Sequence, residues 1–190
     1  MATTGILLCG VGGQGTVTFS NILTKGLMDL GYDVKMSEIH GMAQRGGAVT
    51  TQVRYGEKVY SPSLGFGQAD IIISFEKCEA VRNIAYLREG GIVITDTCEL
   101  NGLPILQGAA EYPHGILDEL EKTVPNVMVV EANKVAAELG NVVVANIVLL
   151  GAMVKAMHLE AADWMGIIES SVPPKTIDHN KASFNAGYAM

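Results

Sequence analysis

The chain has 190 residues, of which 48% are hydrophobic and 17% are charged, and its formal net charge is −7. This composition is typical of one globular domain with a buried core and excludes an intrinsically disordered chain. The negative charge argues against nucleic-acid binding, which needs a basic face, and against adsorption to an anionic membrane.

Two apolar stretches bear on the location of the protein. Residues 1–24 carry no charged side chain, but they lack a basic start and are interrupted by polar residues, so the stretch is not interpreted as a signal peptide. The longest later apolar run, Val142 to Val154, is too short to span a bilayer and contains Asn146. We therefore expect a cytoplasmic protein without a membrane segment.

The first predicted elements form a βαβ unit. A short buried strand at Ile6–Cys9 precedes a helix at Thr16–Leu30, in which apolar residues recur at the spacing of one helical face. Gly31 ends this helix, and a second strand follows at Asp33–Ser37. Strand, glycine-rich loop, helix and strand in this order are typical of a parallel α/β sheet.

The next segment predicts a hairpin. Ala48–Tyr55 is rich in β-forming residues, and Lys58–Tyr60 is expected to pair back on it across a turn at Gly56-Glu57. An antiparallel hairpin within this unit would make the sheet mixed.

The rest of the chain alternates between apolar runs and helical patterns. The expected elements are a strand at Asp70–Phe75, a helix at Glu76–Arg88, a strand at Ile92–Thr95, an irregular stretch at 96–113, a helix at Ile116–Lys122, a strand at Val127–Val130, and helices at Asn133–Leu139, Val142–Met157, Glu160–Ser170 and Thr176–Gly187. The helix at Val142–Met157 is apolar almost all round and should be buried. The fold class is a three-layer α/β/α, Rossmann-like, mostly parallel and mixed sheet in a single domain, residues 1–190.

A glycine cluster follows the first strand. Gly10, Gly12 and Gly15 match the dinucleotide fingerprint G-x-G-x-x-G, and a strand before them and a helix after them complete its context. The candidate site residues of this loop are Gly10, Gly12, Gly13, Gln14, Gly15 and Thr16. Such a loop can hold a phosphate, but its glycines can equally serve a tight turn and close helix–strand contact.

A second glycine-rich loop follows the second strand. Its candidate site residues are Glu38, His40, Gly41, Met42, Gln44, Arg45, Gly46 and Gly47. Loops that leave the carboxyl ends of strands face one crevice, and the guanidinium of Arg45 suits a phosphate or carboxylate. The alternatives are a surface ion pair for Arg45, a hydrogen-bonded turn for His40 and a core contact for Met42. Glu38 ends its strand but opens a long loop instead of a short ribose-binding turn, which weakens the case for a nicotinamide cofactor.

Other chemistry-bearing residues form no motif. Cys9, Cys78 and Cys98 are widely spaced and are expected to be reduced thiols that pack as small apolar residues. Glu76 and Glu79 lie on consecutive turns of one predicted helix and are expected on its solvated face. No metal site is predicted.

The two loops together resemble the gamma-domain family of 2-oxoacid:ferredoxin oxidoreductases. The resemblance continues in order along nearly the whole chain, through Val53-Arg54-Tyr55-Gly56, Tyr60-Ser61-Pro62, Gly67–Asp70, Phe75-Glu76, Glu79-Ala80, Gly90-Gly91, Gly140-Asn141, Asn146, Leu150-Gly151-Ala152, Val172–Lys175, Asn180–Phe184 and Gly187. The His-Gly-Met-Ala-Gln-Arg-Gly-Gly run at 40–47 favours the branch that acts on indolepyruvate and other aryl pyruvates.

The resemblance implies a complex that decarboxylates a 2-oxoacid on thiamine diphosphate, passes electrons through iron–sulfur clusters to ferredoxin, and releases an acyl-CoA. This chain lacks a Gly-Asp-Gly thiamine motif and clustered cysteines. A catalytic alpha subunit is therefore expected to hold the thiamine diphosphate and the 4Fe-4S clusters, with coenzyme A as co-substrate. The glycine loops would face that subunit and help to form the coenzyme A or thiamine diphosphate pocket, and Arg45 would meet an anionic group there. The chain would be inactive alone.

Two alternatives remain open. The glycine fingerprint is also compatible with a freestanding NAD(P)- or FAD-dependent oxidoreductase. The loops could instead only permit close packing between chains, which would make this a purely structural assembly subunit.

Overall fold

The computed structural model describes residues 3–41 and 46–190, with all side chains in these ranges except those at positions 103 and 104. Its elements in chain order are β1 (Thr4–Val11), α1 (Thr16–Asp29), β2 (Asp33–His40), β3 (Ala48–Gly56), β4 (Ala69–Ser74), α2 (Lys77–Arg82), η1 (Ile84–Tyr86), β5 (Leu87–Asp96), α3 (Leu103–Leu106), α4 (Ile116–Thr123), β6 (Val127–Val130), α5 (Ala132–Glu138), η2 (Val142–Val144), α6 (Ala145–Ala156), α7 (Trp164–Glu169), η3 (Pro174–Thr176) and α8 (Ile177–Tyr188).

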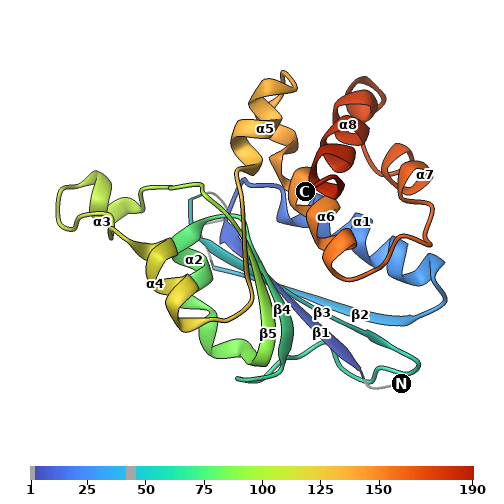
Figure 1. Ribbon diagram of the computed structural model, residues 1–190, viewed down its shortest axis with the longest axis horizontal. Coiled ribbons are helices and arrows are strands. Elements are labelled where there is room, and N and C mark those ends of the chain that lie inside the picture. Colours follow the sequence, from blue (N-terminus) through green and yellow to red (C-terminus); the bar gives the residue numbers. More distant parts are fainter. Residues whose placement is uncertain (1–2, 42–45) are drawn as a thin grey trace.

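A six-stranded mixed sheet forms the middle layer. Its strand order is β2-β3-β1-β4-β5-β6 (Figure 1). Neighbours from β1 through β4 and β5 to β6 are parallel, whereas β3 is antiparallel to both β1 and β2. The expected α/β class and mixed sheet are confirmed. The βαβ unit is present with one change, because β3 is inserted between its two strands.

The predicted hairpin is wrong. β3 pairs along one edge with β1, from Thr4↔Tyr55 to Val11↔Ala48, and along its other edge with β2, from Asp33↔Gly56 to His40↔Val49. Both edges of β3 are thus occupied, so Lys58–Tyr60 has no strand edge to join. Both antiparallel partners of β3, β1 and β2, come before it in the chain.

Helices cover both faces of the sheet (Figure 1). One face packs under α1, α6, α7 and α8, and its core contains buried side chains such as Ile6, Phe19, Ile147 and Phe184. The other face packs under α2 and α4, with Leu7, Ile72, Ala80 and Leu120 in its smaller core. Every residue of α6 from Ala145 to Val154 is buried, as its uniformly apolar sequence predicts. The burial expected for the whole of Val142–Met157 is wrong at both ends: Val142 and Val143 lie in η2 and are exposed, and so is Lys155.

Several predicted helices are shorter in the structure. The helix expected at Glu76–Arg88 ends at Asn83, whose side-chain amide donates to the carbonyl of Glu79 at 2.9 Å, and Leu87 already belongs to β5. The helix expected at Glu160–Ser170 begins only at Trp164, after Asp163 caps it. In both places, local hydrogen bonds from a short polar side chain set the boundary.

Within residues 3–41 and 46–190, no helix combines the length and the apolar character that crossing a bilayer requires.

Asp33, at the start of β2, allows a pH prediction. Its carboxylate pairs with Lys35, accepts the amide of Val59 at 2.9 Å and lies 3.6 Å from Nζ of Lys58, and these contacts lower its pKa from 3.8 to about 2. The depressed pKa stabilises the fold above pH 4, and this contribution is lost as the pH falls towards 2. We expect the melting temperatures of Asp33→Asn and the wild type to converge as the pH is lowered from 5 to 2. A difference that is the same at both ends of this range would contradict the assignment.

Candidate functional site

The two glycine loops lie together at the carboxyl edge of the sheet. The amide of Gly12 donates to the carbonyl of Gly47 at 2.8 Å, and the amide of Gly46 donates to the carbonyl of Gly12 at 3.2 Å. The prediction that both loops share one edge is confirmed by these bonds, although β3 separates the strands that carry the loops. Met42, Gln44 and Arg45 lie outside the described residues.

Three hollows meet at this edge, and Gly12 lines all of them. The first is a cavity of about 440 Å³ that brings together both predicted loops. It is lined by Gly12, Gly13, Gly15, Thr16, Val17, Glu38, His40 and Val49. We call this hollow the loop cavity.

The loop cavity contains the start of helix α1. Gly15 precedes the helix in a left-handed conformation (φ 79°), no side chain caps the first turn, and no acidic residue lies in that turn. The first amides of a helix carry partial positive charge, so this end favours an anionic group. The carboxylate of Glu38 lines the same cavity and accepts from the hydroxyl of Ser20 at 3.3 Å. An anion bound there must therefore keep its charge away from Glu38.

Other residues of the first loop are engaged within the chain. The Gln14 side chain accepts from the amide of Val11 at 2.7 Å and donates to the carbonyl of Phe75 at 2.6 Å, which ties β1 to the end of β4. A Cβ at Gly10 would lie 2.9 Å from Oε1 of Gln14. A Cβ at Gly15 would lie 2.5 Å from the side-chain nitrogen of Asn146. Close packing thus accounts for two glycines of the fingerprint.

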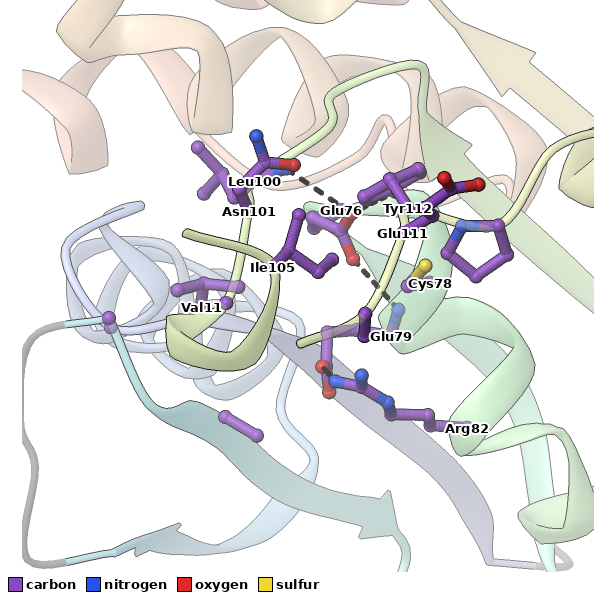
Figure 2. Close-up of a pocket in the computed structure, with 16 residues that line it drawn as sticks. Val11, Glu76, Cys78, Glu79, Arg82, Leu100, Asn101, Ile105, Glu111 and Tyr112 are labelled. Carbon is purple, nitrogen blue, oxygen red and sulfur yellow. Dashed lines mark hydrogen bonds and ion pairs between the residues drawn. The ribbon is translucent and has the colours of Figure 1, made fainter. Parts of the chain in front are cut away.

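The largest of the three hollows is lined by Gly12 and by several residues of the segment 97–115 (Figure 2). This acidic cavity has a volume of about 470 Å³. Its lining combines apolar side chains from Val11, Ala48, Leu100, Ile105 and Pro113 with polar ones from Glu76, Glu79, Arg82, Glu111 and Tyr112. We call residues 97–115 the wall segment, because none of its described residues is buried and it closes the cavity from outside.

Glu76 and Glu79 are not on a solvated face, which corrects the sequence prediction. Their exposed fractions are 1% and 2%. The Glu76 carboxylate caps α2 by accepting from the amide of Glu79 at 3.0 Å, and it also accepts from the amide of Leu100 at 3.4 Å and from the Tyr112 hydroxyl (Figure 2). Glu79 is paired with the exposed guanidinium of Arg82. Glu76 is buried because it both caps α2 and binds residues 100 and 112, contacts that the helical periodicity does not show.

The acidic cavity disfavours additional negative charge. Burial raises the pKa of the Glu79 carboxyl, and the neighbouring Arg82 offsets this only in part. Burial, together with hydrogen bonds to Cys78 and Glu76, raises the pKa of the Tyr112 hydroxyl above its ordinary value. This hollow therefore suits a neutral or cationic group, in contrast to the loop cavity.

A third hollow of about 360 Å³ lies between the first glycine loop and η2. Asp96, which is 1% exposed, lines it and accepts from the amides of Thr97 at 2.8 Å and Ala132 at 2.9 Å; burial raises the pKa of this carboxyl. Burial and the nearby carboxylates of Asp96 and Glu76 also raise the pKa of the Cys98 thiol to about 11. Cys98 is thus a protonated thiol at neutral pH and not an activated nucleophile.

The cysteines bear on whether this chain could hold an iron–sulfur cluster. All three cysteines are free, and Cys9 is buried with its pKa raised to about 12 by burial. A 4Fe-4S cluster takes four thiolates, one more than the chain possesses. Across residues 3–41 and 46–190, no group of three or more His, Cys, Asp or Glu side chains is arranged to hold a metal ion.

Sequence reasoning missed Glu76 and Tyr112. Glu76 directly follows the predicted strand Asp70–Phe75, and a polar residue at the carboxyl end of a parallel strand is a signal that could have identified it. Tyr112 lies in a stretch without periodicity, so nothing local indicates its contact with Glu76.

Comparisons with known proteins give the family. The family model described as pyruvate ferredoxin/flavodoxin oxidoreductase matches residues 5–190. The indolepyruvate oxidoreductase subunit IorB of Thermococcus kodakarensis is 42% identical over 96% of this chain and 93% of its own length. The protein of the same name from Archaeoglobus fulgidus is 35% identical over 96% of this chain and 92% of its own.

Solved structures share the fold. The gamma subunit of a keto/oxoacid ferredoxin oxidoreductase from Geobacter sulfurreducens superposes with a TM-score of 0.73 at 23% identity, covering 100% of this chain and 96% of that one. A 2-oxoglutarate:ferredoxin oxidoreductase from Magnetococcus marinus gives a TM-score of 0.75 at 18% identity, covering 100% of this chain but 31% of that longer one. With the family model matched over residues 5–190 and curated relatives above 30% identity along nearly the full length, this chain belongs to the pyruvate ferredoxin/flavodoxin oxidoreductase family.

Proposed function

We propose that this chain is the subunit without redox cofactors in a complex that oxidatively decarboxylates an aryl pyruvate, indolepyruvate first of all, to the aryl-acetyl-CoA and reduces ferredoxin. The similarity to IorB subunits supports the substrate class. The three cysteines are too few for a 4Fe-4S cluster, which supports placing the clusters and the thiamine diphosphate on a catalytic alpha subunit. Reduced, unpaired thiols are consistent with a cytoplasmic complex.

One observation carries the role of this chain within the complex. The two glycine loops are hydrogen-bonded to each other beside the uncapped start of α1, and they form an open loop cavity at the carboxyl edge. Main-chain amides and a guanidinium favour the phosphates of coenzyme A or thiamine diphosphate. In the proposal, Arg45 and the amides of these loops bind such a group in a pocket that the catalytic subunit completes.

The test is Arg45→Ala in the assembled complex. Loss of one charge-assisted hydrogen bond to a phosphate is expected to raise the apparent KM for coenzyme A about tenfold or more. Lys155→Ala is the matched control, because it removes the same charge from the exposed end of α6 at the opposite edge of the sheet. Steady-state kinetics of both variants, with complex integrity measured by gel filtration, give the answer.

The outcomes separate the alternatives. An unchanged KM and turnover in Arg45→Ala would show that the role assigned to Arg45 is wrong. Loss of assembly, with normal kinetics of the complex that survives, would favour the purely structural subunit.

A nicotinamide or flavin enzyme is the second candidate. The observation in its favour is that Glu38 lines the same cavity as Gly13 and Gly15, as a ribose-binding carboxylate would. Against it, β3 lies between β1 and β2, which are adjacent in dinucleotide-binding sheets. Thermal unfolding of the isolated chain with NADH, NADPH, FAD and coenzyme A distinguishes these ligands, since a ligand that binds only the native state raises the melting temperature.

A further inference from the structure

Four exposed apolar side chains line the hollows that share Gly12. Their exposed fractions are 52% for Val17, 40% for Leu100, 56% for Val142 and 79% for Val143. They come from three distant parts of the chain: Val17 lines the loop cavity, Val142 and Val143 line the hollow beside η2, and Leu100 lines that hollow and the acidic cavity. Apolar side chains that gather from separate segments around a functional edge indicate an interaction surface rather than scattered exposure. We call these four residues the apolar collar.

The collar is held rigidly outward. Asn141 caps the η2 turn by accepting from the amide of Val143 at 3.1 Å, while Val144 and Asn146 directly after it are buried. The amide of Leu100 is bound by the buried carboxylate of Glu76. With the backbone fixed on both sides, Val142 and Val143 stay exposed unless another surface covers them. A preorganised apolar surface of this kind loses little conformational entropy on binding.

We propose that the apolar collar is the surface on which the catalytic subunit docks. This inference rests on the proposed function and names the contact that the proposed function leaves open. Leu100, Val142 and Val143 line a hollow together with the first glycine loop, and Val17 lines the loop cavity itself. A protein that covers these residues therefore also excludes water from the loop cavity where the anionic group would bind.

Two observations favour this partner over others. The curated relatives are named as subunits, and the fold of this chain occupies 31% of a longer chain in the Magnetococcus marinus structure, where it is covalently joined to further protein. The hollow beside Val142 and Val143 has one carboxyl group in its lining, Asp96, and that group is buried, so the rim offers apolar contact and little charge. Such a surface fits the apolar centre of a stable protein interface.

The experiment measures assembly with the cognate catalytic subunit, the chain that carries the Gly-Asp-Gly motif and the clustered cysteines absent here. Val143→Asp places a charge in the proposed interface. It should raise the dissociation constant, measured by isothermal titration calorimetry, at least 30-fold. Val17→Asp, from a different segment, should act in the same direction. Met28→Asp is the matched control: Met28 is 62% exposed at the far end of α1 and should leave the dissociation constant within twofold.

Each result has one meaning. Weak binding of Val143→Asp and Val17→Asp with normal binding of Met28→Asp, at unchanged melting temperatures, supports the collar. Wild-type affinity in both collar variants overturns the collar while leaving the proposed function standing. If the wild-type chain does not bind the catalytic subunit, both the proposed function and the docking of that subunit on the collar are wrong. If the wild-type chain sediments as a homodimer and Val143→Asp sediments as a monomer, the collar binds a second copy of the chain instead. That result also contradicts docking of the catalytic subunit.

Discussion

Gly187→Ala is expected to destabilise the protein by about 3 kcal/mol or more, although alanine is the better helix former. Gly187 lies where α8 crosses α6, and a Cβ there would be 1.9 Å from the carbonyl oxygen of Val148. The contact is reciprocal, because a Cβ on Gly151 of α6 would be 2.1 Å from the carbonyl oxygen of Phe184. Backbone atoms cannot rotate away as a side chain can, so the helices must separate and expose the core between them.

The measurement for Gly187→Ala is urea denaturation monitored by circular dichroism. Asn185→Ala, at an exposed position of the same helix, is the control and should stay within about 0.5 kcal/mol of the wild type. The helix propensity of alanine alone would stabilise Gly187→Ala by up to about 1 kcal/mol. A stability equal to or above that of the wild type would therefore show that α6 and α8 do not approach as closely as described.

Glu76→Ala is expected to lower the free energy of unfolding by about 2–3 kcal/mol and to loosen the wall segment selectively. The substitution removes the N-cap of α2 and two of the bonds that fasten residues 97–115, those to Leu100 and Tyr112. No described residue of the wall segment is buried, so these polar contacts hold it in place of a hydrophobic core. Amide exchange should therefore rise more in this segment than in the sheet.

Tyr112→Phe isolates one of these bonds. It deletes the hydroxyl that donates to Glu76 but keeps the ring, over which the Lys77 ammonium lies at 5.3 Å from the centroid. We expect a smaller loss, about 1 kcal/mol, with faster exchange again confined to the wall segment. Tyr86→Phe, whose ring packs against Phe66 elsewhere, serves as the control. If hydrogen–deuterium exchange of residues 97–115 is the same in Tyr112→Phe and the wild type, the fastening role of Glu76 is wrong.

The acidic cavity and the loop cavity differ in charge preference although they share Gly12. The uncapped first turn of α1 lies in the loop cavity, which Glu38 also lines, and the buried carboxylates of Glu76 and Glu79 line the acidic cavity. In the proposed joint site, a phosphate is therefore expected on the α1 side of Gly12.

Local patterns were sufficient to predict most elements and the place of the two glycine loops. A helix that buries one face has a period of 3.6 residues, and glycines between a strand and a helix mark a turn at the carboxyl edge, so Thr16–Asp29 and the Gly12 loop are readable from neighbouring residues alone. The burial of α6 could likewise be predicted, because its sequence is apolar on all sides. The family resemblance depends on the same local runs.

Tertiary structure alone decided the partners of β3, the burial of Glu76 and Glu79, and the exposure of Val142 and Val143. Which strand edges meet depends on contacts between residues far apart in the chain. The residues of Lys58–Tyr60 therefore cannot indicate that β1 and β2 already pair with both edges of β3. A buried glutamate has the same helical spacing as a solvated one, because its burial depends on the distant amide and hydroxyl that bind it. Local sequence specifies which groups are available, whereas non-local packing determines which of them face water.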